Sequence, residues 1–236
     1  MPLDFSANCN PLGVPQGVKR AISRAAETAD AYPDPLCRAL RGAIAGHEAV
    51  QIENVVCGNG SADLIFRLVL SLKPRRALVP APTFSEYETA LAFAGCDVAY
   101  HLLQANNHFD VDDTLLDSIT DGIDMVFLCN PNNPTGRPIP REPLLRALEK
   151  CAQIGALLVV DECFTAFLDE PENYTLRESL GSKNLLILKA FTKLYGMAGV
   201  RLGYALSGNA ELLERISGAG QPWAVSSLAQ AAGIAA

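Results

Sequence analysis

The sequence predicts an α/β fold built around a mostly parallel sheet. From Val55 onward, short apolar runs of strand length alternate with helical stretches. Helices of this length between strands favour right-handed βαβ units, in which neighbouring strands run parallel. No internal repeat or low-complexity linker interrupts the alternation. We therefore expect the functional residues at the carboxyl ends of the strands, where sites of α/β proteins lie.

The elements follow in chain order. Residues 3–17 are rich in Asn, Pro and Gly and predict an extended arm. Residues 15–29 predict an amphipathic helix, which the prolines at 33 and 35 end. The predicted strands are residues 55–57, 77–79, 97–103, 125–129, 156–160 and 185–188. The predicted helices between them include one that follows the segment 58–63 and runs through residue 72, and others at residues 84–94 and 141–152.

Composition limits the classes of function. The chain has 236 residues, of which 49% are hydrophobic and 19% charged, so it is a folded protein. Its net charge of −7 and the lack of a basic stripe argue against nucleic acid or an anionic membrane as the main partner. The seven cysteines show no C-x-x-C pair and predict buried reduced thiols. We find no leader peptide and no long apolar run, and we expect a cytoplasmic protein.

Lys193 is the candidate reactive residue. The apolar run Leu185–Leu188 predicts a buried strand that brings Thr192 and Lys193 to the rim of the sheet. One lysine taken alone is usually a solvated surface residue. Here a hydroxyl precedes it and Arg201 follows eight residues later, so Lys193 could form a Schiff base while its neighbours hold a phosphate.

A second candidate is the segment Gly58-Asn59-Gly60-Ser61-Ala62, where a predicted strand turns into a helix. Backbone N–H groups and the positive end of a helix can bind an anion there. The pattern alone leaves a nucleotide, a phosphate or a tight turn open. No G-K-[ST] follows and no G-x-G-x-x-G is complete, which argues against a P-loop or Rossmann nucleotide protein.

Three further residues follow predicted strands. Phe84 could stack on a flat cofactor or simply pack in the core. Asn133 lies in the segment 130–136, which its prolines and glycine make rigid, so its amide could be aimed at a ligand or could serve a structural turn. Asp161 ends an apolar strand, an unfavourable place for a carboxylate unless it is paired, for example with a protonated pyridinium nitrogen.

These motifs resemble the fold-type I pyridoxal-phosphate (PLP) enzymes. Within them the chain looks most like the threonine-phosphate decarboxylases of cobalamin biosynthesis, with histidinol-phosphate aminotransferases as near neighbours. The resemblance implies a three-layer α/β/α large domain with a mostly parallel sheet, followed by a small C-terminal domain missing from this chain. The implied boundaries are an N-terminal arm and helix at 1–30, a PLP-binding large domain at 31–220 and the start of an interdomain helix at 221–236.

The resemblance also implies a role for each candidate residue. Lys193 would carry the cofactor, Asp161 would pair with the pyridine nitrogen, and Asn133 would donate to the phenolic oxygen of the ring. Asn8 of the arm would touch the substrate, and Tyr32 would reach the cofactor phosphate of a partner subunit in a homodimer. The remaining cofactor contacts would be Phe84, stacked on the ring, and Ser61, Ala62, Thr192 and Arg201, around the phosphate.

Two positions depart from the aminotransferase pattern. Phe164 stands where aminotransferases usually carry a Tyr, and this favours the decarboxylases. Ala190 replaces a Ser or Thr that helps to hold the phosphate in relatives. The implied reaction is decarboxylation of L-threonine O-3-phosphate to (R)-1-aminopropan-2-ol phosphate. Transamination of the histidinol-phosphate type and a PLP-binding fragment with little activity, lacking both ends of the substrate site, remain alternatives.

Overall fold

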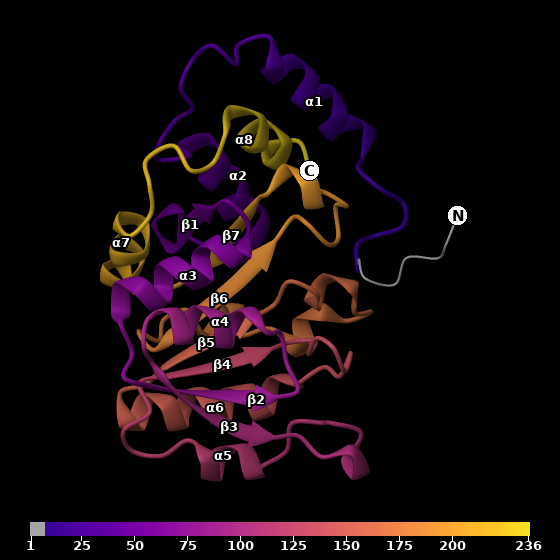
Figure 1. Cartoon of the computed structure of the whole chain (residues 1–236). Coiled ribbons are helices and arrows are strands. Elements are labelled where there is room, and N and C mark those ends of the chain that lie inside the picture. The colour runs from indigo at the N-terminus through magenta and orange to yellow at the C-terminus, as the bar shows by residue number, and fades with distance from the viewer. Residues whose placement is uncertain (1–7) are drawn as a thin grey trace.

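A seven-stranded sheet forms the centre of the molecule, with the strand order β1-β7-β6-β5-β4-β2-β3 (Figure 1). The computed structural model describes residues 8–236. The strands are β1 (Val55–Gly58), β2 (Arg76–Ala81), β3 (Asp97–Leu102), β4 (Met125–Cys129), β5 (Leu157–Asp161), β6 (Leu185–Ala190) and β7 (Gly203–Leu206).

The sheet is mostly parallel, as the alternation of elements predicts. The pairs β2–β3, β2–β4, β4–β5 and β5–β6 are parallel, whereas β7 runs antiparallel to both β1 and β6. Strand β7 is not among the strands predicted from the sequence. It follows β6 through a connection that contains only a short 3-10 helix (Ala198–Val200), and strands joined without a crossover helix commonly pair antiparallel.

Helices cover both faces and complete the three α/β/α layers (Figure 1). One face buries a cluster of apolar side chains shared with α1 (Gln16–Ala26), α2 (Arg38–Glu48), α5 (Thr114–Ser118), α6 (Arg141–Ile154) and α8 (Ser227–Ile234). The other face buries a second cluster shared with α3 (Ser61–Leu72), α4 (Glu86–Phe93) and α7 (Ala210–Gly218). Burial on both faces explains why the strands read as nearly continuous apolar runs.

The structure corrects some predicted elements. The helix predicted for residues 15–29 ends at Ala26, and turns follow it. Helices α2, α5 and α7 are not among the predicted elements. In the part of the chain that the structure describes, no helix has the length and apolar character needed to cross a membrane. All seven cysteines are free, and all except Cys9 are buried, as the sequence predicts.

The carboxyl ends of the parallel strands lie side by side. Cys129 pairs with Asp161 across β4 and β5, and Asp161 pairs with Leu188 across β5 and β6. The backbone bonds continue past the strands, because Asn130 N donates to Asp161 O (2.8 Å) and Glu162 N donates to Leu188 O (2.8 Å). Residues that follow these strands are therefore held together at the carboxyl-terminal end of the sheet.

Candidate functional site

Lys193 lies in the connection after β6, and its amine faces the N-terminal arm. Its Nζ donates to Asn8 Oδ1 at 2.6 Å. The same nitrogen lies 5.2 Å from the centre of the Phe164 ring, within the range of a cation–π contact. The structure thus brings together Asn8 and Lys193, two residues that are far apart in the sequence.

Backbone contacts fasten the arm to the Lys193 connection. Asn10 N donates to Lys193 O (3.0 Å), and Asn10 Nδ2 donates to Leu194 O (2.8 Å). Gly196 has a φ of +62°, and a Cβ there would lie 2.9 Å from the carbonyl carbon of Gly13. The sequence pattern alone assigns no role to Asn10. Its place in the Asn-x-Asn-Pro stretch of the arm is the signal that could have indicated one.

Asp161 ends β5 with its side chain buried, at 5% exposure. Its Oδ2 accepts from Tyr87 OH (2.8 Å) and its Oδ1 accepts from Cys163 N (3.0 Å). Burial raises the pKa of Asp161, although the hydrogen bonds and the charge of Lys193 oppose the rise. No salt bridge to Asp161 occurs among the described residues. A buried carboxylate in this state favours a cationic N–H partner.

The segment between β1 and α3 forms a close-packed cradle under the Arg201 side chain. The first N–H groups of α3 at Ser61 and Ala62 have no acceptor within the helix, and this suits an anion. A Cβ on Gly60, which has a φ of +91°, would lie 2.7 Å from Arg201 Nη2. A Cβ on Gly203 would lie 2.5 Å from Ser61 N. Both glycines are therefore needed for the approach of β7 and Arg201 to the start of α3.

Thr192 is buried in the connection that joins β6 to β7, next to Lys193. This is the same connection that leads to Arg201, so the structure keeps the predicted phosphate contacts Thr192 and Arg201 on one segment.

Asn133 and Phe84 lie on two loops that are tied together. Asn133 lines a cavity of about 400 Å³ whose wall also includes Asn8 and Phe164. The neighbouring Asn132 is buried; its Oδ1 accepts from Thr83 Oγ1 (2.6 Å) and its Nδ2 donates to Pro82 O (3.0 Å). The loop that carries Asn133 is thus fixed to the loop that leads to Phe84.

Phe84 packs edge-on against Tyr87, with ring centres 5.5 Å apart. Tyr87 in turn holds Asp161, so α4 supports both predicted cofactor contacts. Tyr87, Thr83 and Asn132 are not among the residues predicted for the site. Tyr87 lies in the first turn of α4, three residues after Phe84, and this close spacing is the signal that could have found it.

Tyr32 is placed differently from the other candidates. It is 82% exposed, and its ring packs against Trp223 at 4.9 Å between centres. Its predicted contact with a partner subunit stays a prediction.

The described residues contain no cluster of His, Cys, Asp or Glu side chains that could bind a metal.

Comparison with known proteins extends these observations. The chain is 37% identical to the threonine-phosphate decarboxylase of Salmonella typhimurium over 98% of its own length and 63% of that protein. It is 36% identical to the histidinol-phosphate aminotransferase of Bacillus licheniformis over 98% of its length and 64% of that protein. It therefore spans less than two thirds of the length of these relatives.

The fold also matches a solved structure. The histidinol-phosphate aminotransferase of Sinorhizobium meliloti, solved in complex with pyridoxal-5'-phosphate, superposes with a TM-score of 0.84 at 27% identity, over 97% of this chain and 62% of that one. The family described as aminotransferase class I and II matches residues 1–236, the whole sequence. The chain belongs to the aminotransferase class I and II family.

Proposed function

We propose that the Lys193 site binds PLP and that the enzyme to which this chain belongs decarboxylates L-threonine O-3-phosphate. The observation that carries the proposal is the buried Asp161 carboxylate, which has no salt bridge among the described residues. It lies at the end of β5, beside β6, and the connection after β6 contains Lys193. Such a carboxylate suits the protonated ring nitrogen of PLP.

The residues at the carboxyl-terminal end of the sheet suit the phosphate and the ring of this cofactor. The start of α3 at Ser61 and Ala62, together with Arg201 and Thr192, supplies N–H groups, a cation and a hydroxyl for a phosphate. When bound, PLP supplies an electron sink for the electron pair of the bond that breaks at the substrate Cα. Lys193 would bond to the cofactor through Nζ and afterwards hold or move a proton there.

The rim residues would orient the ring and the substrate. Phe84 would stack on the ring face, and Asn133 would donate to the phenolic oxygen. The Asn8 side chain, which accepts from Lys193 Nζ at 2.6 Å, would turn to the substrate once that amine is occupied. Orientation of the Cα bonds against the ring decides which bond breaks, so these contacts bear on the choice between decarboxylation and transamination.

Decarboxylation is favoured by Phe164 and by the similarity to the Salmonella typhimurium protein. Phe164 has no hydroxyl to offer the phenolic oxygen, unlike the Tyr expected in aminotransferases. A second candidate is transamination of the histidinol-phosphate type, because the Bacillus licheniformis relative is almost equally similar. We further propose a homodimer in which Tyr32 contacts the cofactor phosphate of the partner.

Cofactor binding is tested by titrating the purified chain with PLP and reducing the mixture with borohydride. We expect mass spectrometry to find the pyridoxyl group on the peptide that contains Lys193. Lys193→Ala should lose the visible absorption and the adduct, while Lys19→Ala, on the exposed side of α1, should keep both. A folded chain that takes up no PLP would refute the proposal.

The reaction is tested by supplying threonine phosphate, and in a parallel assay histidinol phosphate with 2-oxoglutarate. Release of CO₂ with formation of the amino alcohol phosphate supports decarboxylation. Formation of glutamate in the parallel assay, without CO₂ from threonine phosphate, supports the second candidate. Binding of PLP with neither product would indicate that this chain holds the cofactor without turning over either substrate.

A further inference from the structure

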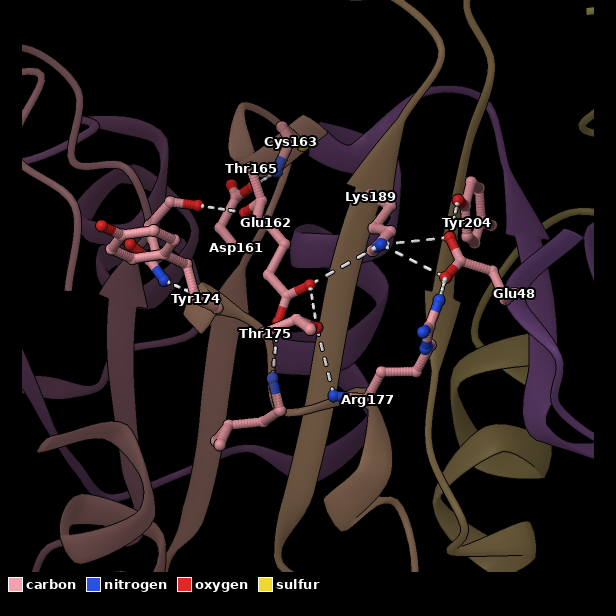
Figure 2. Close-up of polar contacts among 12 residues, drawn as sticks. Glu48, Asp161, Glu162, Cys163, Thr165, Tyr174, Thr175, Arg177, Lys189 and Tyr204 are labelled. Carbon is pink, nitrogen blue, oxygen red and sulfur yellow. Dashed lines mark hydrogen bonds and ion pairs between the residues drawn. The ribbon is translucent and has the colours of Figure 1, made fainter. Parts of the chain in front are cut away.

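A second group of charges lies beside the cofactor site, on the face of the sheet that α2 covers. Figure 2 shows Lys189 between two glutamates. Its Nζ lies 3.1 Å from Glu48 Oε1 and 3.7 Å from Glu162 Oε2. Glu48 also accepts from Tyr204 OH (2.5 Å) and lies 3.5 Å from Arg177 Nη1. We call Glu48, Glu162 and Lys189 the charge clamp.

Both glutamates of the clamp are almost completely buried, at 2% exposure each. Burial raises the pKa of Glu48, but the nearby Lys189 cation and the Tyr204 hydroxyl outweigh it, so this pKa lies below its ordinary value. Burial raises the pKa of Glu162, which lies farther from Lys189. Glu162 instead accepts from Thr175 Oγ1 (2.8 Å) and Leu176 N (3.1 Å).

The clamp joins elements that are remote in the sequence. Glu48 is the last residue of α2, Lys189 belongs to β6, and Glu162 directly follows β5. A fourth element, β7, contacts the clamp through Tyr204, whose hydroxyl donates to Glu48. The clamp therefore ties the ends of β5 and β6 to α2 and β7 through side chains, in addition to the backbone bonds of the sheet.

Each anchor of the clamp is close in sequence to a residue of the cofactor site. Glu162 directly follows Asp161, and Lys189 of β6 lies four residues before Lys193, which is in the connection after that strand. Tyr204 directly follows Gly203, which lies close to the start of α3. A movement of any anchor would move a site residue with it. Buried ion pairs gain little stability over apolar side chains of the same size, so their value here lies in geometry.

We propose that the charge clamp is a positioning device, which fixes the ends of β5, β6 and β7 so that Asp161, Lys193 and the start of α3 meet the cofactor in register. The inference rests on the proposed PLP site. Glu48, Glu162 and Lys189 are positioning residues, because they act through their neighbours. Their loss should change how tightly and in which orientation the cofactor is held, beyond any loss of stability.

The test compares four variants of the chain. Glu162→Gln keeps the shape and removes one charge, Lys189→Met removes the central cation, and Lys189→Arg restores a cation. The control is Leu148→Ala, which creates a cavity beside the C-terminal half of α6. Because α6 connects two parallel strands and runs antiparallel to them, this half lies near the amino ends of the strands, whereas the site lies at their carboxyl ends. All are measured at a temperature where they remain folded.

We expect Glu162→Gln and Lys189→Met to raise the Kd for PLP by about tenfold or more, the lower end of effects seen for supporting residues. They should also reduce the visible circular dichroism of the bound cofactor, which reports its fixed orientation. Lys189→Arg should recover most of both signals. Leu148→Ala should lower the melting temperature and leave both signals close to those of the unaltered chain.

Amide hydrogen exchange of the PLP-free chain gives a readout that does not depend on the cofactor. The clamp variants should speed exchange at Glu162 N–H, which donates to Leu188 O (2.8 Å), and at Phe191 N–H, which donates to Leu202 O (3.2 Å). Leu148→Ala should not do so selectively. If Lys189→Met fails to fold, the isosteric Glu162→Gln decides.

The outcomes separate this inference from the proposed function. An unaltered chain that folds without binding PLP overturns the proposed function, and the exchange data then decide whether the clamp fixes the strand ends. If the unaltered chain binds PLP and the clamp variants lower only the melting temperature, the clamp is merely structural and the inference is overturned. Loss of affinity and dichroism with recovery in Lys189→Arg supports it.

Discussion

Asp161→Asn gives the sharpest test of the proposed site, because it removes a charge and keeps the shape of the side chain. The oxygen that accepts from Cys163 N (3.0 Å) is retained. The new amide takes the place of the oxygen that accepts from Tyr87 OH (2.8 Å), and the hydroxyl can rotate to accept instead. The local hydrogen bonds should therefore survive the substitution.

Without PLP this variant should be more stable than the unaltered chain at alkaline pH. Burial raises the pKa of Asp161 above its ordinary 3.8. The folded state then binds the proton more tightly than the unfolded state, so the free energy of unfolding falls as the pH rises from 3.8 through the raised pKa. Asparagine removes this loss, and the advantage of the variant should vanish as the pH returns toward 3.8.

The affinity for PLP should change in the opposite direction. Removing one partner of a buried charge pair costs about 2–5 kcal/mol, which corresponds to a Kd raised by a factor of about 30 to a few thousand. Stability gained without the cofactor and affinity lost with it form a combined signature. A role of Asp161 in packing alone would lower both quantities.

The assay is thermal unfolding of the PLP-free proteins across the pH range, together with a fluorescence titration with PLP. Asp117→Asn, an exposed substitution on α5, serves as the matched control and should change neither quantity. The proposed role of Asp161 is refuted if Asp161→Asn binds PLP as tightly as the unaltered chain, or if the variant is less stable than that chain at alkaline pH.

Three further outcomes are expected. Gly203→Ala should weaken PLP binding and lower the free energy of unfolding by about 1–3 kcal/mol, because its Cβ would lie 2.5 Å from Ser61 N. The control Gly46→Ala, in an open helical position, should raise the free energy of unfolding by about 0.5–1 kcal/mol. Chemical unfolding measures the stability of each variant, and titration with PLP measures its affinity. Phe164→Tyr should raise transamination relative to decarboxylation, measured as glutamate formed against CO₂ released. Tyr32→Phe should weaken PLP binding by about tenfold or more, through loss of one hydrogen bond to a charged group in the dimer; light scattering that finds a PLP-binding monomer would contradict this.

Much of the sheet could be predicted because its central strands β4, β5 and β6 are mostly buried on both faces. The runs before Asn130 and Asp161 are apolar throughout, as is the run Leu185–Leu188 that leads toward Lys193. Each run ends at a polar residue, so the strands and the position of the site at their carboxyl ends could be predicted. Helix α2 was missed because it contains Gly42 and Gly46, which lower helix propensity, and begins after Cys37 without a side-chain cap.

The residues missed in the site are those that depend on tertiary contacts. The bond from Tyr87 to Asp161 joins residues 74 positions apart, and it exists only because α4 packs against β2 and β3 and Tyr87 reaches the end of β5 from there. Asn10 reaches Leu194 across 184 positions. Single-sequence patterns describe local structure and strand burial, but they carry no signal for which helix will cover a given strand end.

The two acidic residues at the end of β5 illustrate what the sequence pattern leaves open. Successive side chains of a strand point to opposite faces of a sheet. Asp161 accordingly meets Tyr87 on the face of α3 and α4, whereas Glu162 meets Thr175 and Lys189 on the face of α2. Two adjacent carboxylates therefore have separate partners and separate expected effects: Asp161→Asn should raise stability without PLP, whereas Glu162→Gln should loosen the strand ends. The sequence shows both acids, and only the alternation of faces separates Asp161, the proposed cofactor contact, from Glu162 of the proposed charge clamp.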